Sequence, residues 1–293
     1  MATKEKTPVQ TFSFYGGQAI IEKKPWGANY THRRQGEKKT LLSVTSITKK
    51  LDKSGALIPW AVNLACASIL SQIESAGSDA KFGKEEIALM VEEARRSPET
   101  AKVEGGQAGQ FIHDFAHAFA LAKINGTDIP NLDHLDPQNE VHQRALNGIS
   151  GFLDWYNENE VEFMDMEKMF YYNSLLAGDT KEEDPIIEYF GYADLVAKVN
   201  GRVALIDYKS SKGIYSEQMY QARAYSFARD KEIQAVGVSD VAPLTDCDMI
   251  VNFNKTTGEL MTEIIEQEDR EKNIEAFLGL YKVAAREKEL GSY

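Results

Sequence analysis

Residues Tyr189 to Tyr225 form the stretch that decides the fold, YFGYADLVAKVNGRVALIDYKSSKGIYSEQMYQARAY. Asn200-Gly201 lies between two apolar runs, and Asn-Gly in such a setting is the strongest short signal for a β-hairpin with a two-residue type I′ turn. The runs predict strands over 187–199 and 202–210. A helix over 216–229 is expected to follow them.

The turn also predicts which residues face each other across the hairpin. If Val199 pairs with Arg202, then Asp194 lies opposite Asp207, with Cα atoms roughly 4.5 Å apart in a non-hydrogen-bonded pair. Lys209 lies two residues beyond Asp207 and therefore projects from the same face. The alternative is a chance surface pair in which Lys209 neutralises Asp207 in an ordinary salt bridge. The predicted pairing depends on the register, because a single bulge would move Asp194 to the other face.

Opposed carboxylates destabilise a strand pair unless a cation removes their repulsion. Mg²⁺ is typically held by one or two carboxylates together with water and substrate phosphate. A lysine on the same face can orient water or stabilise a developing phosphate charge. The three residue types therefore favour metal-assisted phosphodiester hydrolysis.

In the rest of the chain, the spacing of the apolar residues changes near the middle from a helical to an extended period. This change predicts an α/β (α+β) fold with a mixed sheet flanked by helices and a helical N-terminal region. The other expected helices cover 43–51, capped by Ser43 or Ser46, then 57–74 with Pro59 in the first turn, 84–96, 106–124, 137–156 and 269–289. The other expected strands cover 161–172, 233–241, 247–253 and 260–265.

Three regions follow from this order. Residues 1–42 are polar and basic and are expected to form an arm or a short irregular hairpin without a core. Residues 43–158 are expected to form a helical region, and residues 159–293 are expected to carry the sheet. Residues 43–293 are expected to fold as one compact domain.

The charge of the chain is uneven. The formal net charge is -12, which argues against a protein that coats nucleic acid nonspecifically. The first 60 residues nevertheless hold 11 Lys and Arg against 4 Asp and Glu, and the remaining residues hold 22 against 41. The basic segment is the predicted surface for tracking a phosphate backbone.

Several classes are not expected. No uninterrupted run of 18 apolar residues exists, so no membrane span is expected, and the N-terminus MATKEKTPVQ lacks the apolar region of a secretory signal. Two cysteines, Cys66 and Cys247, give no disulfide framework, zinc ribbon or four-thiolate iron–sulfur site. The sequence holds no G-x-x-x-x-G-K-[ST], and Gly105-Gly106 does not replace it.

Further polar residues are candidates for the site. Gln221 and Tyr225 share a helix face at i and i+4, although spacing alone favours a solvated amide and a half-buried tyrosine without a role in the site. His113 and His117 are also i and i+4, so a two-histidine metal site is an alternative. Glu167 could lie beside the carboxylate pair on an adjacent strand or be an exposed strand charge.

In order, Gly109-x-x-x-His113, Gly191-x-x-Asp194, Asp207-x-Lys209 and Gln221-x-x-x-Tyr225 resemble the motifs of the PD-(D/E)XK nuclease superfamily, in its RecB-like exonuclease branch. The four motifs span 109–225, and the resemblance extends over about 43–290. It implies a nuclease core in 159–293 whose site is covered by the helical region 43–158. It also implies a relative of phage type without an iron–sulfur cluster, because the branch's iron–sulfur members use four cysteines and this chain has two.

The resemblance implies roles for individual residues. His113, Asp194 and Asp207 would be ligands of Mg²⁺ or Mn²⁺, assisted by the backbone carbonyl of Tyr208. Lys209 would position the attacking water. Gln221 and Tyr225 would support Lys209 and the scissile phosphate, and Glu167 would be an accessory acid.

We therefore expect a metal-dependent deoxyribonuclease, an exonuclease acting at DNA ends or on single strands in recombination or repair. The expected partners are DNA and a replication or recombination protein, with no membrane, in the cytoplasm of a bacterial or phage-infected cell. The first alternative is a nuclease-like module that binds DNA or protein without cutting. The second is a metal hydrolase of another class that uses His113 and His117.

Overall fold

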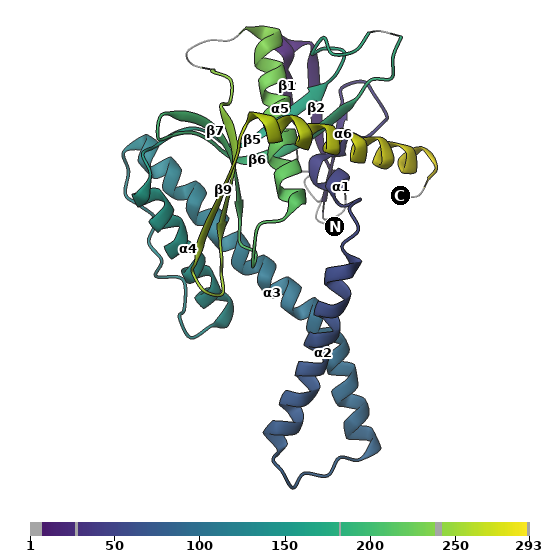
Figure 1. The fold of residues 1–293 in the computed structure, drawn as a ribbon, viewed down its shortest axis with the longest axis vertical. Helices are drawn as coiled ribbons and strands as arrows, with labels where there is room; N and C mark the ends of the chain where they lie inside the picture. The colour runs from purple at the N-terminus through teal and green to yellow at the C-terminus, as the bar shows by residue number, and fades with distance from the viewer. Residues whose placement is uncertain (1–7, 27–28, 182, 238–241, 292–293) are drawn as a thin grey trace, which may run out of the picture.

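A mixed six-stranded sheet forms the centre of the computed structural model, which describes residues 8–26, 29–181, 183–237 and 242–291. Its strands are β4 (Leu42–Ser43), β5 (Val161–Asn173), β6 (Glu188–Val199), β7 (Arg202–Lys209), β8 (Cys247–Phe253) and β9 (Leu260–Ile265). The helices are α1 (Val44–Thr48), α2 (Ser54–Ala76), α3 (Lys84–Asn125), α4 (Glu140–Glu158), α5 (Ser216–Val236) and α6 (Gln267–Glu289) (Figure 1). The predicted α/β class is confirmed.

The β6–β7 hairpin has the predicted turn and register. Asn200 and Gly201 have φ values of 50° and 84°, as a type I′ turn requires. Pairing runs from Val199↔Arg202 to Leu195↔Ile206. The ladder stops there, one pair short of Asp194 and Asp207.

The ladder stops because the sheet divides at this point. Along one edge of β6, the C-terminal half of β6 pairs with β7, and Tyr189 and Phe190 of β6 pair with β4. Between these two ladders, residues 191–194 have no ladder partner on that edge among the described strands. The other edge of β6 pairs with β5 along almost its whole length. Asp194 therefore lies where two strands part, a position at which side chains can reach between them.

Two helical layers cover the sheet. Helices α1, α5 and α6 bury apolar side chains on one face, where Val44, Tyr225 and Phe277 belong to a common core. Helices α3 and α4 cover the other face through a second core that includes Ile112 and Trp155. Both cores reach β6 and β7 from opposite sides, which holds the hairpin rigidly between them.

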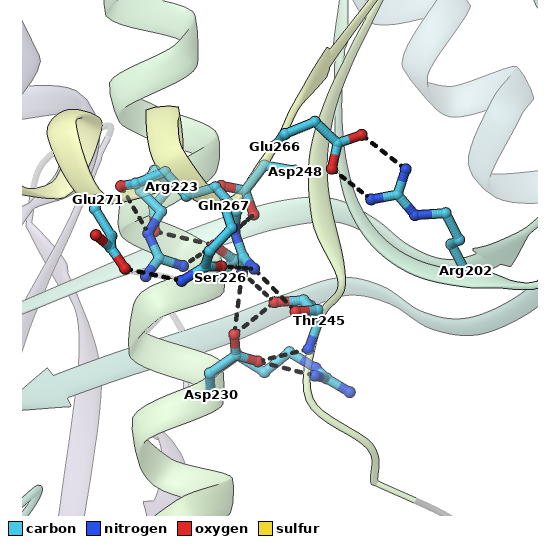
Figure 2. A network of polar contacts seen from close by, with 11 residues as sticks. Arg202, Arg223, Ser226, Asp230, Thr245, Asp248, Glu266, Gln267 and Glu271 are labelled. Carbon is cyan, nitrogen blue, oxygen red and sulfur yellow. Dashed lines mark hydrogen bonds and ion pairs between the residues drawn. The ribbon is translucent and has the colours of Figure 1, made fainter.

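A buried polar network ties β8 to α5 and α6 (Figure 2). Asp248 on β8 is fully buried and lies 3.3 Å from Arg270 Nε of α6, and Arg270 Nη2 lies 3.2 Å from Asp230 Oδ2 of α5. Arg223 Nε donates to the Arg270 carbonyl at 3.1 Å. Removing one partner of such a buried pair leaves an uncompensated charge, so the network fixes the strand beside β7.

One helix replaces the two that were predicted over 84–96 and 106–124. Helix α3 runs unbroken from Lys84 to Asn125 with Pro98 inside it. Proline has no N–H to give to the Ala94 carbonyl, but the Ser97 hydroxyl donates to that carbonyl at 2.8 Å. This hydrogen bond satisfies the carbonyl that the proline leaves without a donor, and such an unpaired carbonyl is one of the two reasons why proline breaks a helix.

Smaller differences lie at element ends. The α1 cap uses both predicted serines, since Ser43 and Ser46 form a reciprocal capping box. Helix α2 begins at Ser54, so Pro59 lies in its second turn rather than its first. Asn139, whose side chain accepts from Val141 N at 2.9 Å, starts α4 instead of Pro137.

The predicted strand over 233–241 is wrong where it can be compared. Residues 233–236 continue α5 as helix, and Ile233 is buried there. Residues 238–241 lie outside the described residues. Helix α5 therefore extends seven residues beyond the predicted end at Arg229.

The N-terminal segment is a packed sheet, not an arm. Strands β1 (Gln10–Phe14), β2 (Ala19–Trp26) and β3 (Asn29–Arg34) form an antiparallel three-stranded sheet. Phe14, Tyr15 and Ile21 are buried against Tyr171 of β5 and Phe190 of β6. Alternating apolar residues in QTFSFYGGQAII supply this core, and the basic residues beside them had hidden it.

Helix α2 and the N-terminal half of α3 form a hairpin that projects away from the sheet (Figure 1). No residue of α2 is buried, and the exposed Cys66 lies at its middle, whereas Cys247 is buried in β8. Although it has no unbroken apolar run, α2 is the one helix in the described ranges that is long and apolar enough to cross a membrane by length and composition, with a mean hydropathy of 1.5.

Candidate functional site

Three elements bring the predicted site residues together where β6 and β7 part. His113 on α3 places Nδ1 3.3 Å from Asp194 Oδ1 on β6. The other carboxylate oxygen, Asp194 Oδ2, accepts from the backbone N–H of Tyr208 on β7 at 2.7 Å. On β7 itself, Lys209 Nζ forms an ion pair with Asp207 Oδ2.

The two carboxyl groups have different electrostatic environments. Burial, only partly offset by Lys209 and reinforced by the charge of Asp194, raises the pKa of Asp207 to about 6. Burial also acts to raise the pKa of Asp194, but His113, Lys209 and the Tyr208 N–H outweigh it and lower that pKa. Burial acts to lower the pKa of His113, but the neighbouring Asp194 more than offsets this, so that the pKa is raised.

The carboxylates brought together here are the type of ligand that binds a hard divalent cation. Asp207 is 4% exposed, and its Oδ2 has no hydrogen bond besides the ion pair with Lys209. A buried carboxylate near a second one is stabilised by a cation. Within the described residues, however, no three His, Cys, Asp or Glu side chains are grouped as a metal site. In this arrangement His113 and Lys209 supply the positive charge.

Tyr208 contributes through its backbone. Its ring is buried in the core under α3 and α4, and its N–H orients Asp194. Its carbonyl as a metal ligand stays a prediction.

Gln221 and Tyr225 point toward α1. The Gln221 amide donates to Thr48 Oγ1 at 2.9 Å, so its hydrogen bond goes to α1 rather than to Lys209. Tyr225 is buried against Gly191, where an added Cβ would lie 2.2 Å from the ring. Burial, with the charge of Asp207, raises the pKa of Tyr225 well above its ordinary value, so the phenol is neutral near the carboxylates.

Glu167 and His117 form a neighbouring pair. His117 Nδ1 lies 3.8 Å from Glu167 Oε2, one helical turn beyond His113. Glu167 has a φ of 45°, between the pairs Met166↔Leu195 and Lys168↔Ala193, which places it beside Asp194 in the β5–β6 ladder. Glu167 therefore lies next to the carboxylates, as the sequence allowed, and both it and Asp194 line the same cleft.

A cleft of about 1630 Å³ opens in front of these residues, and His113, Glu167 and Asp194 lie in its wall. Its lining includes six cationic side chains, Lys23, Lys53, Lys102, Arg144, Lys212 and Lys255. Four carboxylates also line it, Asp52, Glu167, Asp194 and Glu217. The cleft is thus more basic than the chain as a whole.

Two features of this cleft were missed in the sequence. Asn252 is fully buried and binds Ser211 three times, accepting from its N–H at 2.9 Å and its hydroxyl at 3.0 Å and donating to its carbonyl at 3.0 Å. These bonds hold the chain that leaves Lys209. The sequence signal for Asn252 was its place as an asparagine inside the apolar run CDMIVNF. Lys255, three residues later, had no such signal.

Comparisons with known proteins add no family. No protein-family model and no curated protein matches the chain. A solved chain described as "Crystal structure of SSO0001" aligns with a TM-score of 0.27 and 13% identity, over 48% of this chain and 60% of that one. The aligned part is thus less than two thirds of that chain, and a similarity of this size says nothing about function.

Proposed function

We propose that the protein is a divalent-metal-dependent DNA nuclease, an exonuclease that hydrolyses phosphodiester bonds at DNA ends or on single strands. The observation that supports this most is the pair Asp194 and Asp207 with Lys209 where β6 and β7 part, with Asp194 lining a cleft that also carries six cationic side chains. Carboxylates, a lysine and a basic groove suit metal-assisted phosphodiester hydrolysis.

In this proposal, His113, Asp194, Asp207 and the Tyr208 carbonyl hold Mg²⁺ or Mn²⁺. When bound, the metal supplies charge that makes water a nucleophile at neutral pH and stabilises the phosphate in the transition state. It would take over the neutralisation that His113 and Lys209 provide to the carboxylates here.

The chain's own residues have separate tasks. The Tyr208 N–H holds the Asp194 carboxylate in place, and the lowered pKa keeps it charged at neutral pH. Lys209, released from Asp207, orients the attacking water and faces the phosphate. Tyr225 packs on Gly191 and keeps α5 against the divided sheet.

The test is a time course on 5′- and 3′-labelled single- and double-stranded DNA with Mg²⁺, Mn²⁺ or EDTA. We expect metal-dependent shortening from an end, abolished by EDTA, by Asp207→Ala and by Lys209→Ala. Glu263→Gln, a change of an exposed acid on β9, is the control and should cleave normally. Wild-type cleavage by purified Asp207→Ala would show that the site assignment is wrong.

The first alternative is a nuclease-like module that binds DNA or protein without cutting. Metal titration followed by calorimetry separates the two. A nuclease binds Mn²⁺ in the wild type and loses that binding in Asp207→Ala, whereas the module binds DNA equally with and without metal.

A hydrolase built on both histidines makes a different prediction. His117 is paired with Glu167 rather than with the central carboxylates. We therefore expect His113→Ala to abolish cleavage and His117→Ala to reduce it only mildly. Equal losses in the two variants would favour the two-histidine site.

A further inference from the structure

Lys255 is a half-buried cation without an acidic partner. It follows β8 in the turn before β9, lines the cleft, and donates to the Gly105 carbonyl at 2.9 Å and to the Ser210 hydroxyl at 3.5 Å. No carboxylate forms an ion pair with it anywhere in the described part of the chain. Partial burial of an ammonium without a counter-charge is unfavourable, unless an anion binds from solution.

A second cation increases this cost. Arg144 on α4 lines the same part of the cleft, and burial together with the Arg144 charge lowers the pKa of Lys255. Arg144 itself forms ion pairs with Glu104 at 3.7 Å and with Glu140 at 3.6 Å. Lys255 is therefore the cation of this corner that no carboxylate of the described residues neutralises.

The position of Lys255 is held by the protein itself. The Asn147 amide of α4 donates to the Lys255 carbonyl at 3.3 Å and to the Thr256 carbonyl at 3.2 Å. Within the turn, Asn254 Oδ1 accepts from Thr256 N at 3.0 Å. An ammonium on a pinned turn loses less conformational entropy when it binds a ligand than one on a free loop.

Glycines keep the adjoining surface of α3 open. A Cβ at Gly109 would lie 2.8 Å from the Ser210 hydroxyl, so glycine allows α3 to approach the end of β7. A Cβ at Gly106 would meet nothing within 4 Å. Beside Lys255, the helix thus presents backbone instead of side chains, and a ligand can come close.

We propose that Lys255 and Arg144 form a binding subsite for a backbone phosphate of DNA, the one adjacent to the phosphate that is cleaved. The proposal rests on the proposed function. Ser210, which Lys255 contacts, directly follows Lys209, and Gly109 lies one helical turn before His113, so the subsite borders the carboxylates. Lysine binds phosphate as a point charge, and such contacts position the strand without reading its sequence.

The experiment measures binding of a fluorescein-labelled single-stranded oligonucleotide in Ca²⁺ buffer by anisotropy over a range of KCl concentrations. We expect Lys255→Met and Arg144→Met each to weaken binding about tenfold, the effect of losing one charged hydrogen bond. Each should also lower the log–log salt slope by about 0.7, the value for one phosphate contact on a single strand.

Matched variants keep the result interpretable. Lys255→Arg should bind within about twofold of wild type, because the charge is retained. Lys272→Met, which removes an exposed lysine of α6 outside the cleft lining, should change neither affinity nor slope. The thermal unfolding temperature of Lys255→Met must match that of the wild type. If it does not, the affinities and salt slopes of Lys255→Arg and Arg144→Met decide on the subsite.

The subsite and the nuclease activity fail in different ways. If the wild type binds DNA but never cuts it, while Lys255→Met weakens binding, the subsite stands and the nuclease is rejected. If Asp207→Ala abolishes cleavage but Lys255→Met leaves the KM, the affinity and the salt slope unchanged, the subsite is rejected and the nuclease stands. A wild type that does not bind the oligonucleotide overturns the subsite, and the cleavage time course then decides on the nuclease.

Discussion

At Asp207, two physical effects act on a single side chain in the same direction. Burial and the charge of Asp194 both favour its protonated form, and the ion pair with Lys209 opposes them only in part. The hairpin register was sufficient to predict that Asp194, Asp207 and Lys209 are neighbours. It could not predict that Asp194 uses one oxygen to bind the Tyr208 N–H, because that contact requires the strands to separate.

His32 is the residue for which the structure predicts a pH effect on stability. It is 7% exposed, stacks on Phe190 with centroids 4.0 Å apart, and shares a hydrogen bond with the Tyr192 hydroxyl at 3.1 Å. Burial, assisted by the charge of Lys23, lowers its pKa to about 4. Because the unfolded state binds a proton near pH 6.5, this contribution to stability is complete above that pH and is lost as the pH falls toward 4.

We expect the wild type to lose about 2 kcal/mol of unfolding free energy from this residue between pH 7 and pH 5. His32→Gln keeps a neutral amide but cannot titrate, so its stability should fall less over the same interval. Urea unfolding at the two pH values measures the difference. Parallel losses in wild type and variant would contradict a buried neutral histidine.

At the scale of elements, the division of the sheet is the feature that positions the site. The pairing of β6 with β7 ends at Leu195, and the pairing of β6 with β4 begins at Phe190. Between these two points, the ring of Tyr225 packs against Gly191. Glycine is required there because any side chain would enter the space of that ring.

Gly191→Ala should therefore destabilise the protein by about 1–3 kcal/mol, the usual cost of overpacking a core. Its Cβ would lie 2.2 Å from Tyr225 Cε1 and 3.1 Å from Val44 Cγ2. Gly279→Ala on α6 is the control, since its Cβ meets nothing within 4 Å and alanine favours helix, so it should stabilise slightly. Thermal unfolding of both variants tests the pair, and a neutral Gly191→Ala would contradict the tight packing.

Strands with strong local signals were the elements best predicted from the sequence. The ranges 247–253 and 260–265 agree with β8 and β9, because alternation and the turn at Gly258 act over a few residues. Helix α3 was predicted as two helices because Pro98 is a breaker in any local reading, and the compensating Ser97 bond is visible only in the folded helix. The strand predicted at 233–241 began in apolar residues that belong to α5.

At the scale of the whole molecule, basic composition concealed a folded unit. Residues 1–42 carry many Lys and Arg, yet β1–β3 bury Phe14, Tyr15 and Ile21 against the main sheet. Of the six cations in the cleft lining, two, Lys23 and Lys53, come from the first 60 residues. The N-terminal charge accounts for part of the predicted DNA surface, and α3, α4 and the loops after β7 and β8 supply the rest.

The two roles of the N-terminal sheet can be separated by two substitutions. Ile21→Ala should lower the unfolding free energy by about 2–4 kcal/mol, because Ile21 is fully buried. Lys23→Met should weaken DNA binding and leave stability within about 1 kcal/mol, since its contacts to the Tyr30 and Tyr192 rings are of cation–π type. Denaturant unfolding and anisotropy measure the two effects. An unchanged stability in Ile21→Ala would restore the interpretation of this segment as an arm.

The projecting hairpin of α2 and α3 also makes the native chain a ready subject for spectroscopy. Cys66 is exposed at the middle of α2, whereas Cys247 is 1% exposed in β8, and burial raises the pKa of its thiol. A maleimide dye should therefore attach at a single position without any engineered cysteine. Since α3 is one continuous helix from the hairpin to His113, a fluorophore at Cys66 would report in real time on tilting of the element that carries the histidine.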